Sequence, residues 1–170
     1  YFGDNPEPGI ALKCYDQVLR DWPALPLADQ AVLWKAQLEI FSMEKERALK
    51  GVEDLRLRLS SHPGNPMAAL QWMLIGSAYE KPLEDPLKAV AAYKSAEAAG
   101  LPPLTRLGPL YWKIANLAER GGDKATAVLY YTRIITEVKR SSFAYDCQAR
   151  IRSLGGEPPP LADLFKDTGP

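Results

Sequence analysis

Apolar residues recur at helical spacing in three stretches of the chain that begin 39 residues apart. Each stretch places aromatic or aliphatic residues three and four positions apart, which is the pattern of a helix with one buried side. The three stretches are Leu33–Ile40, Trp72–Tyr79 and Tyr111–Ala118. The pattern therefore predicts three similar helices, one in each stretch.

A second predicted helix follows each of these three, with an alanine, a bulky residue and a smaller or aliphatic residue on one side. The second helices contain Ala48/Val52/Leu55, Ala89/Tyr93/Ala96 and Ala127/Tyr131/Ile134, and an unpaired copy, Ala11/Tyr15/Val18, opens the chain. Helix pairs repeated at such a period are typical of stacked arrays, in which each unit buries one face against its neighbours. Arrays of this kind present a groove to other molecules and rarely carry out chemistry.

Proline, glycine and capping residues indicate where the helices begin and end. Asp85-Pro86 predicts a helix start, with the aspartate as N-cap and proline in the first turn. Gly121-Gly122-Asp123 predicts a tight turn between paired helices, and Ser141 or Ser142 is expected to cap a terminal helix that stops at Gly155-Gly156.

The pairs resemble tetratricopeptide repeats, because Trp72-x2-Ile75-Gly76-x2-Tyr79 and Ala89-x3-Tyr93-x2-Ala96 match nearly every position of that family's signature. The resemblance implies an all-α fold: a right-handed α-solenoid of antiparallel helix pairs, with about 3.5 repeats and a C-terminal capping helix. We expect this helical domain to span residues 1–156 and to be followed by a Pro-rich tail, 157–170.

Two narrower resemblances are also present. The segment from Asp85 to Gly100 is similar to the Sel-like subgroup, although Lys81-Pro82-Leu83 stands where that subgroup has a glycine pair. The stretch Ser141-Ser142-Phe143-Ala144 is similar to the tetratricopeptide domains of bacterial envelope proteins such as outer-membrane assembly lipoproteins.

In the tetratricopeptide family, the residue after the first signature position points into a concave groove, together with the residue one turn later. Those positions are Trp34, Met73 and Trp112, followed by Leu38, Ser77 and Asn116. Trp is favoured at binding hot spots and Met adapts to varied ligands. We expect a groove for an extended or helical apolar segment of a protein or peptide partner, with Asn116 and Ser77 giving polar register. An aromatic stripe at this spacing is also typical of core packing, and the sequence leaves that alternative open.

The resemblance does not extend to the family's carboxylate clamp for chaperone tails, because Trp112 stands where the clamp needs a lysine before Asn116. A second use of the array is self-association through its open N-terminal edge, at Ile10, Leu12, Tyr15 and Leu19. The tail segment Leu161–Phe165 is either a linker or a pseudo-ligand that folds back into the groove.

Composition supports a non-enzymatic reading with no cofactor. The chain has 21 basic and 21 acidic residues, so no global positive field attracts nucleic acid. No apolar run reaches the roughly 20 residues that span a bilayer. His62 is the single histidine and lies in a Pro-Gly loop, and no Cys or His spacing fits a metal site. Cys14 and Cys147 are expected to be small buried hydrophobes.

The sequence therefore predicts a protein-interaction scaffold, with a structural or oligomerisation module as the alternative. It does not decide between the cell envelope and the cytoplasm. Because the chain begins with Tyr1, we expect that a targeting segment could precede it.

Overall fold

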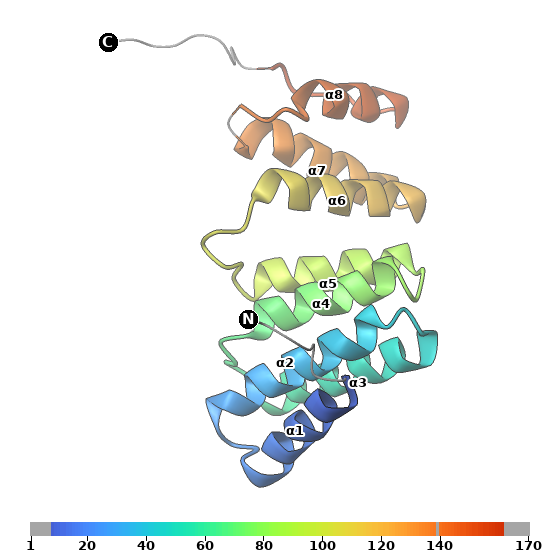
Figure 1. The fold of residues 1–170 in the computed structure, drawn as a ribbon. Helices are drawn as coiled ribbons and strands as arrows, with labels where there is room; N and C mark the ends of the chain where they lie inside the picture. The colour runs from blue at the N-terminus through green and yellow to red at the C-terminus, as the bar shows by residue number, and fades with distance from the viewer. Residues whose placement is uncertain (1–7, 139, 162–170) are drawn as a thin grey trace, which may run out of the picture. The chain divides into compact units, whose positions relative to one another are not determined.

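The computed structural model describes residues 8–138 and 140–161, and this part of the chain contains helices and no strands (Figure 1). The all-α class predicted from the sequence is confirmed for these residues. The chain divides into two compact units, residues 1–102 and 103–170.

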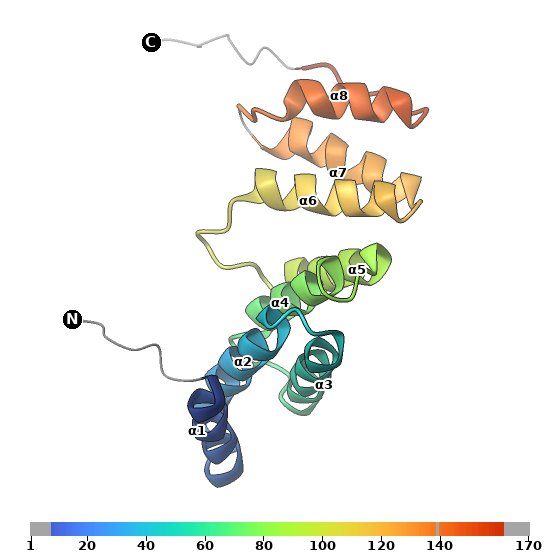
Figure 2. The same cartoon turned by 45° about the vertical axis from the view of Figure 1, so that its right-hand side comes forward.

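The first unit contains five helices that pack as neighbours along the chain. They are α1 (Pro8–Asp21), α2 (Pro26–Phe41), α3 (Lys45–Ser61), α4 (Ala68–Glu80) and α5 (Pro86–Ala98). The α2–α3 and α4–α5 pairs are helical hairpins, α1 packs on α2, and both α2 and α3 contact α4 (Figures 1 and 2). Helix α2 is therefore in contact with three other helices.

A close approach of helices holds the α4–α5 hairpin together. A Cβ atom at Gly76 of α4 would lie 2.7 Å from Cε1 of Tyr93, which is buried on α5. Only glycine fits there without moving the ring, and Ala89 on α5 is likewise fully buried. Gly76 and Ala89 stand at the two small-residue positions of the repeat signature that the sequence resembles.

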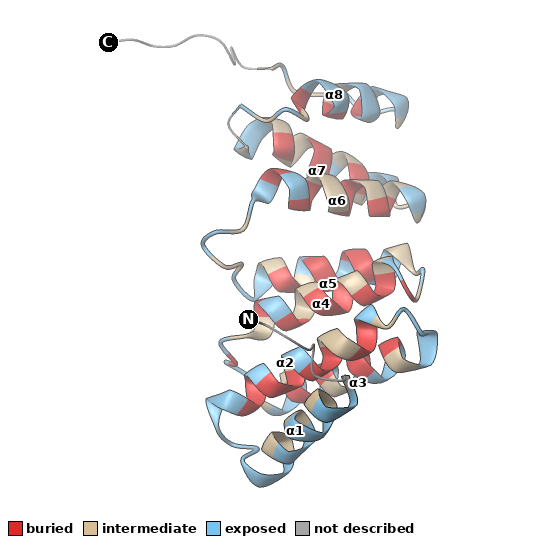
Figure 3. Ribbon diagram, viewed as in Figure 1, coloured by how far each residue is buried: buried red, intermediate tan, exposed pale blue. Residues whose placement is uncertain are grey.

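The second unit contains α6 (Leu107–Arg120), α7 (Lys124–Glu137) and α8 (Ala144–Ser153). Helix α7 packs against both α6 and α8. Its buried residues include Tyr131 and Ile134, and α8 contributes Cys147 and Ile151 (Figure 3).

Several predicted helix ends are confirmed. The side chain of Asp85 accepts a hydrogen bond from the backbone N–H of Lys88 at 3.0 Å, and Asp123 accepts one from Thr126 at 3.0 Å. Gly122 and Gly155 follow α6 and α8 with φ of 82° and 84°, a conformation that glycine adopts without strain.

Two local predictions were wrong. Helix α8 begins after Phe143 and has no side-chain cap; the Ser141 hydroxyl instead accepts a hydrogen bond from the backbone N–H of Phe143 at 3.2 Å, in the turn that leads into the helix. Cys147 is buried as expected, but Cys14 is exposed, because it lies outside the half-buried side of α1 that Leu12, Tyr15 and Leu19 form. The proposed tail segment lies outside the described residues beyond Leu161.

Candidate functional site

Helix α2 is unusual because its charged residues point inward and its largest apolar residues point outward. Its charged side chains are Asp29, Lys35 and Glu39, and all three are buried. Burial of a charge is costly unless an opposite charge and hydrogen bonds compensate for it. The partners of these residues therefore explain how α2 can expose its apolar side.

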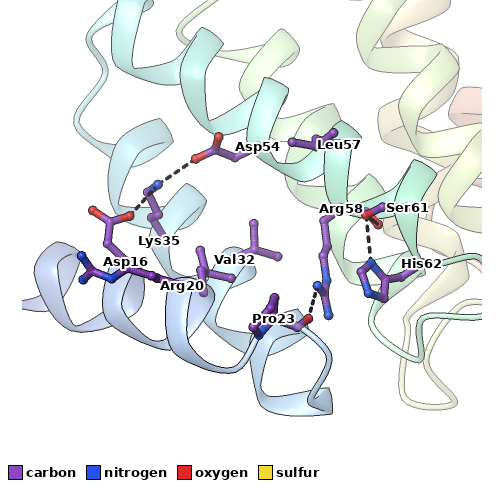
Figure 4. Close-up of a pocket in the computed structure, with 11 residues that line it drawn as sticks. Asp16, Arg20, Pro23, Val32, Lys35, Asp54, Leu57, Arg58, Ser61 and His62 are labelled. Carbon is purple, nitrogen blue, oxygen red and sulfur yellow. Dashed lines mark hydrogen bonds and ion pairs between the residues drawn. The ribbon is translucent and has the colours of Figure 1, made fainter.

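Lys35 joins three helices of the first unit. Its ammonium group lies 2.9 Å from a carboxylate oxygen of Asp16 on α1 and 2.9 Å from one of Asp54 on α3 (Figure 4). Burial by itself lowers the pKa of Lys35, but the hydrogen bonds and charges of the two carboxylates outweigh it and raise the pKa above its ordinary value. Lys35 is therefore a fixed cation that ties α1 and α3 to α2.

Asp29 anchors the beginning of α2 through a second network. The guanidinium of Arg58 on α3 donates to the Asp29 carboxylate and to the backbone oxygen of Pro23, the latter at 2.7 Å. The backbone oxygen of Asp29 accepts a hydrogen bond from Gln71 of α4 at 3.2 Å, and Asn65 donates to the Gln71 side chain at 2.9 Å. This buried polar network fixes α2 against α3 and α4.

Glu39 is less completely compensated. Its Oε1 atom lies 3.3 Å from the ammonium of Lys50, an exposed side chain of α3. Its Oε2 atom is buried and has no hydrogen-bond partner in the part of the chain that the structure describes. Lys50 is exposed, so water screens its attraction for Glu39. Glu39 is therefore the least compensated of the three buried charges on α2.

The outward side of α2 carries a row of apolar residues. Leu27, Trp34 and Phe41 are 50%, 48% and 57% exposed, and they are spaced seven residues apart. Positions seven apart lie on nearly the same side of a helix, so the three side chains form one stripe, with half-buried Leu38 beside it. We call Leu27, Trp34, Leu38 and Phe41 the α2 stripe.

Helix α4 carries the next two predicted groove residues along the chain, Met73 and Ser77. Met73 and Ser77 are half-buried, and the Ser77 hydroxyl lies 3.3 Å from the hydroxyl of Tyr93, within hydrogen-bonding distance. Leu70, one turn before, is exposed. Trp34 and Leu38 lie on α2, and Met73 and Ser77 lie on α4. These two helices are in contact within the first unit.

The predicted groove residues of the second unit take part in its own packing. The Trp112 ring stacks on Phe143, with ring centroids 5.0 Å apart and an angle of 14° between the planes. It also meets the ring of Tyr131 edge-on at 5.4 Å. The side-chain amide of Asn116 donates to the backbone oxygen of Trp112 at 2.7 Å. Trp112 is thus a half-buried packing residue, whereas Trp34 occupies the corresponding repeat position and is exposed.

The predicted N-terminal edge is mostly covered. Leu12, Tyr15 and Leu19 are half-buried on α1, and Ile10 is 57% exposed. Leu12, Tyr15 and Leu19 are less exposed than the residues of an open edge would be, because α1 packs on α2.

A cleft of about 540 Å³ lies between α1 and α3, with α2 as its floor (Figure 4). Val32 and Lys35 come from α2, Leu19 from α1, and Leu57 from α3. At one end, the ring Nδ1 of His62 lies 2.9 Å from the Ser61 hydroxyl. The buried charged groups of this cleft are held in ion pairs between helices, which gives them a role in packing.

The described residues were compared with what a metal site and a membrane span each require. In residues 8–138 and 140–161, no group of three His, Cys, Asp or Glu side chains could hold a metal ion. Over the same residues, none of the helices has the length and apolar character required to cross a bilayer.

The sequence prediction named Trp34 and Leu38 but neither the buried charges of α2 nor Leu27 and Phe41 of the α2 stripe. The missed signal is the spacing of Asp29, Lys35 and Glu39, which fall on the same side of the helix as Ala28, Val32 and Ala36. Comparison with known proteins gave no match to a protein-family model, to a curated protein or to a solved structure.

Proposed function

We propose that the chain is a protein-interaction module of the tetratricopeptide type, which binds an apolar segment of a protein partner on the outward side of its first helices. The proposal assigns no catalysis and no cofactor. The single observation that carries it is the α2 stripe, in which Leu27, Trp34 and Phe41 are left half-exposed on a helix whose charged side chains are all buried.

The inversion of α2 argues for a binding surface. Scattered exposed apolar residues are common on proteins and need no explanation. The α2 stripe gathers three such residues on one side of a single helix, and the largest apolar patch on a monomer is often a functional site. Trp34 lies in the middle of the stripe, and tryptophan contributes more often than most residues to hot spots of binding energy.

Helix α4 extends the proposed surface. Met73 is the repeat equivalent of Trp34, and its flexible thioether side chain adapts to ligands of different shape. Exposed Leu70 adds apolar area on the same helix. The repeat pattern also favours the proposal, since the α2–α3, α4–α5 and α6–α7 hairpins coincide with the three repeats of the sequence.

The proposal gives the second unit a smaller part. Trp112 packs against Phe143 and Tyr131, so the ring is already occupied within its own unit. Trp112 and Asn116 remain groove residues by resemblance, whereas Trp34 is supported by its exposure. Half-buried Leu38 lies on the same helix as Trp34, and half-buried Met73 lies on α4.

A pull-down from lysate tests the proposal with a matched control. The bait variants are Trp34→Ala and Leu87→Ala, since Leu87 on α5 is 47% exposed, nearly the same as Trp34. Both variants should have the circular dichroism spectrum of the wild type. We expect the wild type and Leu87→Ala to capture the same partner and Trp34→Ala to lose it. Equal capture by all three baits would count against the α2 stripe as the binding site.

A second candidate function is association through α1, for which the exposure of Ile10 is the supporting observation. Light scattering distinguishes it from the first. An oligomer that dissociates on Ile10→Asp or Leu19→Asp substitution and persists in Trp34→Ala would favour the α1 edge.

A further inference from the structure

The cleft between α1 and α3 has an apolar middle and two polar ends. Three apolar side chains, one from each of α1, α2 and α3, line its middle: Leu19, Val32 and Leu57. Lys35 lies at one end, and Arg58, Ser61 and His62 lie at the other (Figure 4). Its volume of about 540 Å³ falls within the range of about 300–1,000 Å³ that is usual for small-molecule sites.

Arg58 uses only part of its guanidinium within the protein. Its buried side chain donates from Nε to the Asp29 carboxylate and from Nη1 to the backbone oxygen of Pro23. A guanidinium has further N–H donors on Nη2, and these have no acceptor among the residues that the structure describes. An unpaired donor on a buried side chain costs free energy. The Nη2 group therefore suits an acceptor oxygen that comes from outside the chain.

The charges around the cleft favour an anionic oxygen at the Arg58 end. His62 is half-buried there, one turn after Arg58, and imidazole is the side chain that most readily gains a positive charge near neutral pH. The two carboxylates that line the cleft, those of Asp16 and Asp54, lie at the opposite end (Figure 4). Each is 2.9 Å from the ammonium of Lys35, so they already have a cation between them.

From this geometry we propose that the cleft binds a small aliphatic carboxylate. Its carboxylate accepts hydrogen bonds from Nη2 of Arg58 and lies beside His62, and its hydrocarbon chain runs along the apolar middle. Hydrogen bonds between a guanidinium and a carboxylate are charge-assisted, and the planar fork of arginine matches the two oxygens. None of the residues of the α2 stripe lines the cleft, so this site goes beyond the proposed function.

The test is an NMR titration of the isotope-labelled full chain with hexanoate. The titration runs to about 20 mM, well above the dissociation constant on the order of 1 mM that we expect for so small a ligand. The backbone N–H signals of Leu19, Val32 and Leu57 should shift and saturate. Hexanamide has the same shape without the charge and should bind at least about fivefold more weakly. Hexylammonium should bind no more tightly than hexanamide.

Arg58→Lys tests the donor that the proposal depends on. Lysine retains a positive charge beside Asp29 but lacks the Nη2 group, so the dissociation constant of hexanoate should rise about tenfold. Circular dichroism checks that the variant is folded. An unchanged constant in the folded variant would overturn the proposal.

A second pair of variants leaves Arg58 in place. Leu57 and Leu49 are exposed residues of α3, 69% and 46% respectively, but only Leu57 lines the cleft. Leu57→Asp sets a carboxylate against that of the ligand and should weaken hexanoate binding about tenfold. Leu49→Asp introduces the same charge outside the cleft and should leave the constant unchanged. Equal weakening in both variants would place the ligand elsewhere.

Two results of the titration itself would also overturn the proposal. One is the absence of a saturable shift at the cleft residues at the highest hexanoate concentration. The other is hexylammonium binding as tightly as hexanoate, because Asp16 and Asp54 would then select the ligand in place of Arg58. Capture of a protein partner that depends on Trp34 bears on the proposed function alone, so the two proposals fail independently.

Discussion

Substitution of Lys35 by methionine tests whether the inward charges of α2 hold the first unit together. Methionine retains most of the length and apolar character of the lysine stem but removes the cation between Asp16 and Asp54. The two carboxylates would then face each other across α2 without a compensating charge. We expect the first unit to lose stability, with α1 the most affected because few of its side chains are deeply buried.

The magnitude follows from how far each group is buried. Removing one partner of a fully buried ion pair costs about 3–5 kcal/mol. The Lys35 side chain is 10% exposed, but those of Asp54 and Asp16 are 29% and 55% exposed, so water can solvate part of the carboxylate charge. We therefore expect a loss of about 2 kcal/mol in the free energy of unfolding.

Urea unfolding followed by circular dichroism measures this loss. With a slope of about 2 kcal/mol per molar urea, the midpoint should fall by about 1 M. Lys45→Met is the control, because Lys45 pairs with Glu84 at 3.6 Å in full exposure and should contribute less than about 0.5 kcal/mol.

A triple variant provides the refuting comparison. Adding Asp16→Asn and Asp54→Asn to Lys35→Met removes the uncompensated charges and should recover more than half of the lost stability. An unchanged midpoint in Lys35→Met, or a triple variant no more stable than the single one, would refute the reasoning.

Three other predictions concern the packing and the helix ends. Gly76→Ala should destabilise the chain by about 1–3 kcal/mol in urea unfolding, because the new methyl group meets the buried Tyr93 ring, whereas Gly9→Ala, with open space around it, should be neutral or stabilising. Burial raises the pKa of the Cys147 thiol from 9.0 to about 12. The unfolded chain therefore releases this proton at lower pH than the folded chain, and the free energy of unfolding should fall between pH 9 and pH 12, less steeply in Cys147→Ala; equal slopes in the two proteins would contradict this. Asp123→Ala should cost about 1 kcal/mol through loss of the cap at the start of α7, and a thermal melt unchanged from wild type would show that the hydrogen bond contributes nothing.

The parts of the fold that depend on local spacing could be predicted from the sequence. Helical periodicity, the cap at Asp85 and the turn at Gly121-Gly122-Asp123 are each set by residues near one another in the chain. The predicted serine cap of α8 was wrong, because the Ser141 hydroxyl can accept a hydrogen bond from a backbone N–H in the preceding turn as well as from one in the helix.

The surroundings of the candidate site could not be predicted in the same way. Trp34 and Trp112 were assigned the same position in the predicted repeats, yet Trp34 is exposed and Trp112 stacks on Phe143, which lies outside the predicted repeats. The inward position of Lys35 depends on Asp16 and Asp54, which come from two other helices. Repeat spacing assigns charged residues to solvent, and it contains no information on such long-range pairs.

The two cysteines give the chain a built-in pair of chemical probes. Cys14 is exposed on α1, so a thiol reagent reaches it in the folded protein, whereas Cys147 is fully buried in the second unit and its raised pKa keeps it as the unreactive thiol. Labelling of Cys147 therefore requires the second unit to open, and its rate reports that opening without any engineered residue. A label on Cys14 lies in the first unit, on a helix that packs against α2. One unmodified chain can therefore carry a label on the first unit and a thiol that measures the opening of the second.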